Sequence, residues 1–527
     1  MPKNDDLEAG NFEATPPKTS GARGDAPGAG AFKKSAPEIG TKTSVTTSSE
    51  PTKGRRGSLP LSMTILLISA FIGNFTQTQL STALPQLVDD FGISLTMGQW
   101  VTSVFMLTLG IMVPMTAFLT KRFTTRQITI VCLSVFVLGS LVAYFSTNFL
   151  LLIVGRILQA AGTGILLPCL QIIIFSQLPI GKRGTMMGMV GLVLAAAPAV
   201  GPTLGGWQTD MFGWRSIFLL LTALGVILLV VTIFFMGSYG RRENTSIDFI
   251  SVILSTLGFG GLLFGFTNVE QYPVSNPLVW APMLVGIVCL VWFVCRQQNL
   301  KRKDKKPLLN LAVLQVRNFT IGTLVVSLNF FAFSAFTVLI PIYLQTYRGM
   351  EATLSGLVTL PGALLSACSG LIAGRFFDRI GAHKLCVTGA TLMLVGAAMS
   401  LPLTMETSVV YLAVAQAVRM AGIGLVMTTC NTWALASLPS HLINDGTAVT
   451  NTLRQCVGAI GAPVIVVLTE TVEGYLSGTG VSSTLAGVIG SRWGIGLSTF
   501  FYVILLLVAI FWVRNKKRNL VQELDLE

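Results

Sequence analysis

Long apolar runs, separated by short polar segments, occupy most of the chain beyond its first sixty residues. A helix needs roughly 20 apolar residues to cross a bilayer, because each residue adds about 1.5 Å and the hydrocarbon core is about 30 Å thick. Fourteen runs approach or exceed this length: 61–82, 98–119, 128–146, 149–176, 185–208, 215–237, 248–268, 277–295, 319–346, 353–376, 385–403, 408–437, 447–469 and 494–513. The pattern predicts an all-α polytopic membrane protein with fourteen transmembrane helices.

The basic residues between these runs predict how the chain is oriented. Seventeen Lys and Arg lie in the even-numbered loops, and only Arg215, Arg348 and Arg492 lie in the odd-numbered ones. Loops rich in Lys and Arg stay in the cytoplasm. Both termini are therefore expected on the cytoplasmic side of the plasma membrane, which agrees with an even number of spans.

Composition excludes an ordinary soluble enzyme. Hydrophobic residues make up 52% of the chain, charged residues 11%, and the mean hydropathy is +0.70, whereas a soluble domain carries about a quarter charged residues. The net charge of +13 lies in the tails and loops instead of on one soluble domain, so we expect a lipid bilayer and no nucleic acid as partner. The polar segment 1–59 is expected to be a disordered cytoplasmic tail.

Residues for catalysis or metal binding are scarce. All eight cysteines lie within or beside apolar runs, and none has the CxxC spacing of a zinc or redox site. The chain has two histidines and no Gly-x-x-x-x-Gly-Lys-Ser/Thr phosphate loop. We therefore predict no enzymatic activity, no cofactor, no metal and no use of ATP.

A weak internal repeat indicates two related halves. The segments 116–127 and 373–384 resemble each other, and each is followed by a short run and then by a longer run with an intramembrane Arg and a Gly-x-Gly. Repeated helix sets surround a central site in many secondary transporters. We expect six-helix halves at 60–237 and 319–514, two extra helices and a cytoplasmic loop at 238–318, and a cytoplasmic tail at 515–527.

Polar side chains inside the predicted spans are candidates for the lining of a central cavity. An intramembrane Arg costs roughly 2.5–3.5 kcal/mol on insertion scales, so it faces a cavity, a partner or a backbone carbonyl. The alternative is that these residues only brace neighbouring helices or, for the Phe residues, face lipid. The candidates are Asn74, Thr76, Gln77 and Ser81 in span 1, Arg156 and Gln159 in span 4, Asn329, Phe333 and Phe336 in span 9, Gln416 and Arg419 in span 12, and Arg454 in span 13.

Carboxylates are missing from the same region. Thirteen of the 23 acidic residues lie outside the two tails, and none is near a predicted span centre. Arginines without nearby acids favour an anionic or neutral amphipathic substrate over a cationic one.

Span 5 combines small residues with prolines. Glycines four residues apart let another helix approach closely, and prolines favour a kink. The residues are Gly191, Pro198, Gly201, Pro202, Gly205 and Gly206.

Several of these motifs together resemble the major facilitator superfamily, and more closely its 14-helix drug:proton antiporters. The span 5 residues are similar to the antiporter motif, and Arg156, Gln159, Gly162 and Gly164 are similar to the helix 4 motif. The cytoplasmic gate motif of the second half is matched by Gly374, Asp378, Arg379, Gly381 and Lys384. The resemblance implies a bacterial multidrug exporter that works as a monomer by proton antiport and alternating access, with Asp378 and Arg379 as a latch.

Two departures from this family leave alternatives open. Thr76 stands where the helix 1 motif holds an Asp, and Ala117, Lys121 and Thr124 replace the Gly, Asp and Gly of the first-half gate. A Thr cannot carry a proton. A proton-independent facilitator or uptake carrier therefore remains an alternative, as does a membrane sensor that does not transport.

Overall fold

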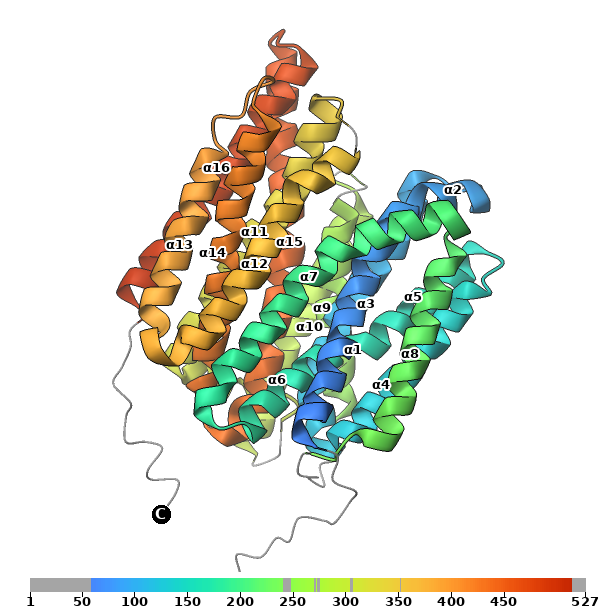
Figure 1. Ribbon diagram of the computed structural model, residues 1–527, viewed down its shortest axis with the longest axis vertical. Helices are drawn as coiled ribbons and strands as arrows, with labels where there is room; N and C mark the ends of the chain where they lie inside the picture. Colours follow the sequence, from blue (N-terminus) through green and yellow to red (C-terminus); the bar gives the residue numbers. More distant parts are fainter. Residues whose placement is uncertain are drawn as a thin grey trace, which may run out of the picture. The chain divides into compact units, whose positions relative to one another are not determined.

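The computed structural model describes residues 58–239, 248–269, 272, 275–303, 307–350 and 352–513. Within these ranges the chain forms helices and connecting segments and no β-strand (Figure 1). The predicted tails at 1–59 and 515–527 lie outside the described residues, except for Ser58 and Leu59.

The first half consists of eight α-helices. Polar residues at several of their starts cap free backbone N–H groups: Ser94 accepts from Met97, and Thr124 forms a capping box with Gln127. The helices are α1 (Leu59–Gln79), α2 (Leu84–Phe91), α3 (Leu95–Arg122), α4 (Thr125–Tyr144), α5 (Phe149–Thr163), α6 (Leu166–Gln177), α7 (Ile180–Phe212) and α8 (Arg215–Phe235), with a 3₁₀ turn, η1 (Leu80–Ala83), between α1 and α2.

The rest of the chain adds eight more α-helices. They are α9 (Phe249–Val269), α10 (Pro277–Arg302), α11 (Arg317–Pro341), α12 (Ala352–Ile380), α13 (Ala382–Met399), α14 (Val409–Ala436), α15 (Ile443–Gly478) and α16 (Ser483–Phe511). Short turns η2 (Leu311–Gln315) and η4 (Ser440–Leu442) precede α11 and α15, and a π-helical segment, η3 (Ile342–Tyr347), follows Pro341.

Every predicted apolar run falls on helix, but the count of fourteen spans is not confirmed. Thirteen helical segments among the described residues are long and apolar enough to cross a membrane. The run at 185–208 falls on α7, a helix of 33 residues that is not among the thirteen. The side chains of several residues of α7, those of Pro198 and Pro202 among them, lie outside the described part of the structure. Its length of about 50 Å exceeds the hydrocarbon thickness.

Two predicted boundaries differ from the structure. The run at 149–176 is divided into α5 and α6, because the regular helix is interrupted at Gly164 and Ile165. The polar segment expected between 469 and 494 is mostly helix, since α15 continues to Gly478 and α16 begins at Ser483. Hydropathy marks where a helix leaves the apolar layer and not where its backbone hydrogen bonds end.

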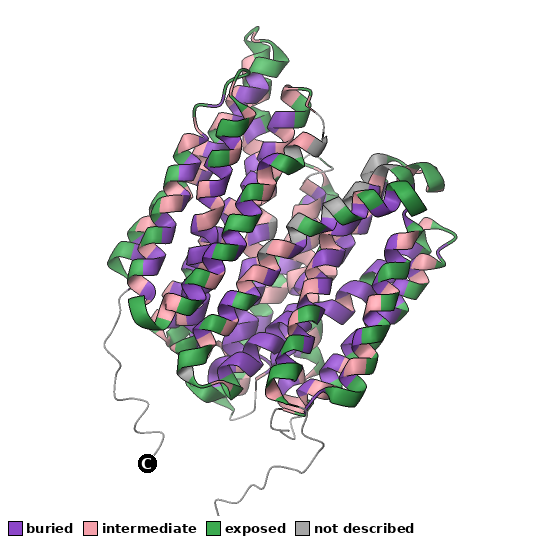
Figure 2. Ribbon diagram, viewed as in Figure 1, coloured by how far each residue is buried: buried purple, intermediate pink, exposed green. Residues whose placement is uncertain are grey.

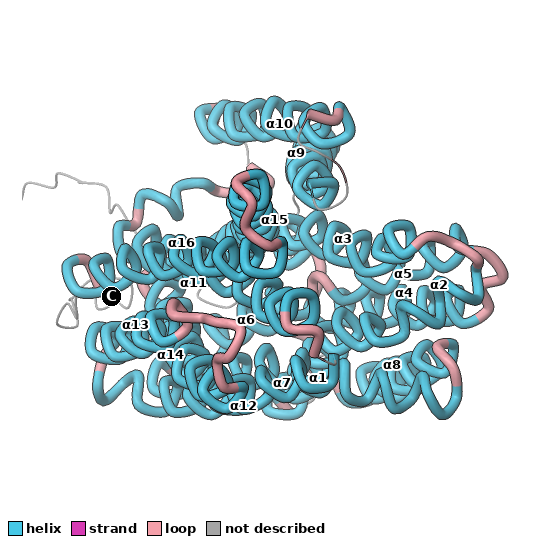
Figure 3. Tube along the Cα trace, turned by 90° about the horizontal axis from the view of Figure 1, so that it is seen from above, coloured by secondary structure: helices cyan, strands magenta, loops and turns pink. Residues whose placement is uncertain are grey.

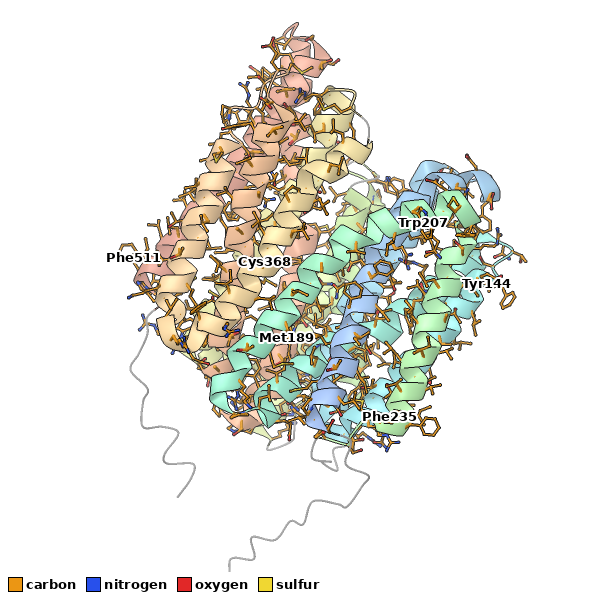
Figure 4. All side chains as sticks on the ribbon, viewed as in Figure 1. Tyr144, Met189, Trp207, Phe235, Cys368 and Phe511 are labelled. Atoms are coloured by element: carbon orange, nitrogen blue, oxygen red, sulfur yellow. The ribbon has the colours of Figure 1, made fainter. Side chains whose placement is uncertain are left out.

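Large apolar side chains cover much of the outer surface, as expected for helices that face lipid. Exposed examples include Leu150, Phe235 and Phe511, and the last two point away from the bundle in Figure 4. Buried residues concentrate between the helices (Figure 2). The α9–α10 pair lies beside the other helices (Figure 3), and α9 contacts both α3 and α15.

Among the described residues, the two halves share a hydrophobic core at one end. We call the end at which α1 begins (Leu59) and α16 finishes (Phe511) the tail face, and the opposite end the far face. The core of the first half includes Phe319, Leu435 and Val449, which lie where α11, α14 and α15 meet the tail face. The other core cluster contains residues of the second half alone. The halves are therefore packed together near the tail face.

Candidate functional site

A crossing of α7 and α12 brings the halves into backbone contact. A Cβ added to Gly184 would lie 2.6 Å from the carbonyl oxygen of Gly374, and one added to Gly188 would lie 3.0 Å from that of Gly370. Each helix contributes two glycines four residues apart, which is the pattern that lets helices pack closely in lipid. Gly374, predicted as part of the gate, is thus one of four glycines that make this contact.

Farther along α7, its neighbours change from the second half to the first. Gly191 faces Thr428 of α14, whose Oγ1 would be 2.7 Å from an added Cβ, whereas Gly201 packs on Thr78 and Gln79 of α1. Gly205 is buried and Gly206 half-buried, and the side chains of Pro198 and Pro202 lie outside the described part of the structure. The ribbons of α7 and α12 accordingly diverge towards the far face (Figure 1).

An ion pair joins the halves beside this crossing. Lys121 Nζ at the end of α3 lies 2.8 Å and 2.9 Å from the two carboxylate oxygens of Asp445 at the start of α15. The Asp445 side chain is 2% exposed, and it also accepts from the backbone N–H of Asn310 at 3.0 Å. The sequence analysis did not select this pair. One sequence feature pointed to it: Lys121 occupies a gate position at which the resembled family has Asp.

A second polar contact joins the halves deeper inside. Asn451 Nδ2 of α15 donates to Gln171 Oε1 of α6 at 2.6 Å, and both residues are buried. Thr447, one turn earlier, accepts a second hydrogen bond from Asn451 through its carbonyl oxygen.

The other predicted gate residues lie at the same end of α12 but make different contacts. Asp378, Arg379 and Lys384 are exposed, and no hydrogen bond or ion pair joins Asp378 or Arg379 to a described residue. Gly381 has φ +84° between α12 and α13, a value that glycine adopts without strain. The latch role of Asp378 and Arg379 stays a prediction.

Arg156 is completely buried inside the first half. Its guanidinium donates to the carbonyl oxygens of Val101 on α3 at 3.1 Å and Thr76 on α1 at 3.3 Å, and to Gln159 Oε1 at 3.0 Å. It also lies 4.2 Å from the centre of the Phe105 ring. Arg156 therefore holds α1, α3 and α5 together.

We expect the variant Arg156→Ala to be less stable than the wild type. The change removes three hydrogen bonds from a charged donor, and each is worth about 1.5–3 kcal/mol. A thermal-unfolding assay on the purified protein in detergent should give a transition several degrees lower. An unchanged transition would argue against a bracing role, and Arg215→Ala, which removes a 44% exposed side chain, is the control.

Arg419 has a comparable environment in the second half. It donates to Gln416 Oε1 at 3.1 Å and 2.6 Å and to the hydroxyl of Tyr502 on α16 at 3.2 Å. The Phe336 ring of α11 lies 4.0 Å from its guanidinium carbon. The sequence spacing thus correctly paired both arginines with Gln. Nothing in the sequence indicated that Tyr502 and Phe105 contact them.

Arg454 differs from the other two arginines. It is 7% exposed, its Nε has no hydrogen-bond partner, and no described residue accepts from its guanidinium. Its guanidinium carbon lies 5.2 Å from the centre of the Phe330 ring on α11. Phe330 packs against Phe333, with ring centres 5.6 Å apart, and Asn329 is buried beside them with its Oδ1 unpaired.

The polar stripe of span 1 is only partly buried. Asn74 and Gln77 are half-buried, and Asn74 bonds back to the carbonyl of Ala70 at 2.9 Å. Thr76 is buried, and its hydroxyl donates to the carbonyl of Ile72 at 2.7 Å. The side chain of Ser81 lies outside the described part of the structure. The contact of these residues with a substrate stays a prediction.

Comparison with known proteins gives consistent relatives. The model of the Major Facilitator Superfamily matches residues 66–463. The chain is 41% identical over 402 residues to the uncharacterized MFS-type transporter YcnB of Bacillus subtilis, covering 76% of this chain and 84% of YcnB. It is 36% identical over 430 residues to the lincomycin resistance protein LmrB of Listeria monocytogenes, covering 80% and 90%.

Among solved structures, the human organic anion transporter MFSD10 (TETRAN) matches with a TM-score of 0.61 at 12% identity, over 85% of this chain and 99% of that one. That likeness concerns the fold alone. The helical architecture, the two packed halves and the family match over most of the chain agree, and this multi-pass membrane protein belongs to the Major Facilitator Superfamily.

Proposed function

We propose that the chain exports amphipathic organic compounds, including antibiotics, from the cytoplasm by alternating access. The observation that carries the proposal is that, among the described residues, the contacts between the halves gather near the tail face. The halves are joined there by the glycine crossing and by Lys121–Asp445, while the outer part of α7 packs within its own half. A transporter that alternates its access needs a state that is sealed on one side only.

The tail face is assigned to the cytoplasm. The loops that meet it hold seventeen Lys and Arg, against three on the other side, which is the bias of cytoplasmic loops. The described state is then closed to the cytoplasm, as an exporter must be when it releases its substrate outside. The relative LmrB is named as a lincomycin resistance protein, which supports this direction.

Protons are the proposed driving ion, with facilitated diffusion or uptake as the alternative. Proton antiport requires a group that binds a proton on one side and releases it on the other. Thr76 cannot do so, and the described carboxylates lie towards helix ends, as Asp445 and Asp378 do. If coupling occurs, it uses such a carboxylate or the substrate itself.

Reconstitution tests function and coupling together. The purified protein is placed in liposomes with an internal pH dye and an imposed proton gradient, and anionic, neutral and cationic amphiphiles are added in turn. We expect proton flux with anionic or neutral compounds and none in protein-free liposomes. Substrate movement without proton flux would favour the facilitator, and no movement of any compound would contradict transport.

A further inference from the structure

We propose that Arg454, together with the Phe330–Phe333 pair, binds the acidic group and the adjoining aromatic ring of the exported compound. This inference rests on the proposed function, since it names the class of substrate. It assigns to one arginine a role that the sequence assigned equally to three.

The three buried arginines differ in what they contact. Arg156 and Arg419 each donate to protein oxygens, and each also lies on an aromatic ring. Arg454 is about as deeply buried, yet no described oxygen receives its protons. A guanidinium without acceptors in a membrane interior has a high desolvation free energy. Such groups line ligand pathways or are paired when a ligand binds. A bound carboxylate or sulfonate supplies two acceptors in the geometry that a guanidinium matches.

Arg454 lies on the face of α15 that also bonds to the first half. Thr447, Asn451, Arg454 and Gly458 recur at intervals of three and four residues and so share one face of α15. Asn451 on this face bonds to Gln171 of the first half. Arg454 lies one turn farther from the tail face, roughly 14 Å along the helix from Asp445 at about 1.5 Å per residue. It is thus farther from the tail face than the two polar contacts that join the halves.

The surroundings of Arg454 suit an aromatic acid. Phe330 and Phe333 are half-buried, unlike Phe336, which is 1% exposed under Arg419. Gly458 leaves space for Phe330, because a Cβ there would lie 2.5 Å from its ring. Two tilted rings beside a cation offer stacking for an aromatic body and an ion pair for its charged end.

No described carboxylate competes for this cation. Along α15 the acidic residue before it is Asp445, which is bound to Lys121, and the next ones after it are Glu470 and Glu473. Glu473 accepts from Tyr347, the last residue of η3. The charge of Arg454 is left for a ligand.

A matched pair of probes tests the proposal. 1-Pyrenesulfonate and 1-pyrenesulfonamide share an aromatic body and differ in charge at neutral pH. Their affinities are measured by energy transfer from protein tryptophan to pyrene in lipid nanodiscs, and export of the sulfonate is measured in liposomes. We expect the wild type to bind the sulfonate at least about 10-fold more tightly than the sulfonamide. Arg454→Gln should reduce this ratio to about one, and Arg454→Lys should restore part of it.

Arg419→Gln serves as the matched control, because it removes a buried arginine that already has protein acceptors. It is expected to lower stability and keep the sulfonate preference. The inference is overturned if Arg454→Gln keeps the preference, or if the wild type binds both probes equally. Export of neutral compounds in that case would leave the proposed function standing. Binding of the sulfonate through Arg454 without its export would instead support the site and contradict export, and no binding of either probe would contradict the site.

Discussion

Lys121→Met and Asp445→Asn are each expected to lower transport by at least about tenfold. Removing one partner of a largely buried ion pair leaves the other charge uncompensated, and for fully buried pairs the cost is about 3–5 kcal/mol. Lys121 keeps 19% of its side chain exposed, so a part of that cost applies here. A free-energy change of about 1.4 kcal/mol changes the ratio of two conformations tenfold. Even a part of the cost of the lost ion pair therefore shifts the protein towards a state that is open at the tail face.

Charge reversal separates a gate from a merely structural pair. The double variant Lys121→Asp with Asp445→Lys restores the attraction between the halves, and we expect it to recover part of the transport lost in the single variants. Recovery should be incomplete, because the backbone N–H of Asn310 that now bonds to Asp445 would face a lysine. Initial export rates in liposomes, normalised to the amount of inserted protein, check the prediction. Normal rates in both single variants would show that the pair does not control access.

Gly374→Ala is expected to lower transport more than any other single methyl addition along α12. The new Cβ would overlap the carbonyl oxygen of Gly184 and lie 2.8 Å from the Cα of Gly188. Both neighbours are backbone, so no side chain can rotate away, and the two helices must separate. The tail face then cannot seal, and export should decrease by at least about tenfold, as measured by the same liposome assay.

Gly356→Ala is the control for this change. Gly356 lies on the same helix, and a Cβ there meets nothing within 4 Å. The variant Gly356→Ala should leave export unchanged, because it adds a methyl group to α12 without a steric overlap. Equal rates for the two variants would mean that the glycine crossing is not required for transport.

Local patterns predicted the helices well because their physical cause is local. Each of the fourteen apolar runs falls on helix, since a span must be apolar along its own length. The partners of Arg156 and Arg419 on their own helices followed from a spacing of three residues, which places Gln159 and Gln416 on the same face.

Contacts between distant segments were not predictable in the same way. Lys121 and Asp445 are 324 positions apart, and no periodicity links them. The three arginines also look alike in the sequence. The further acceptors of Arg156 and Arg419 come from other helices, and only the fold brings these within reach. The outer ends of α15 and α16 were missed because helix continues there beyond the apolar layer.

The unpaired charge of Arg454 has a consequence for the membrane voltage. A substrate that binds this cation as an anion takes its negative charge with it as access switches from one side to the other. Bacterial cells are negative inside, so outward movement of one negative charge releases about 2.3 kcal/mol for each 100 mV. An anion exporter without a central carboxylate therefore has an electrical driving force for export even where no proton is carried in return.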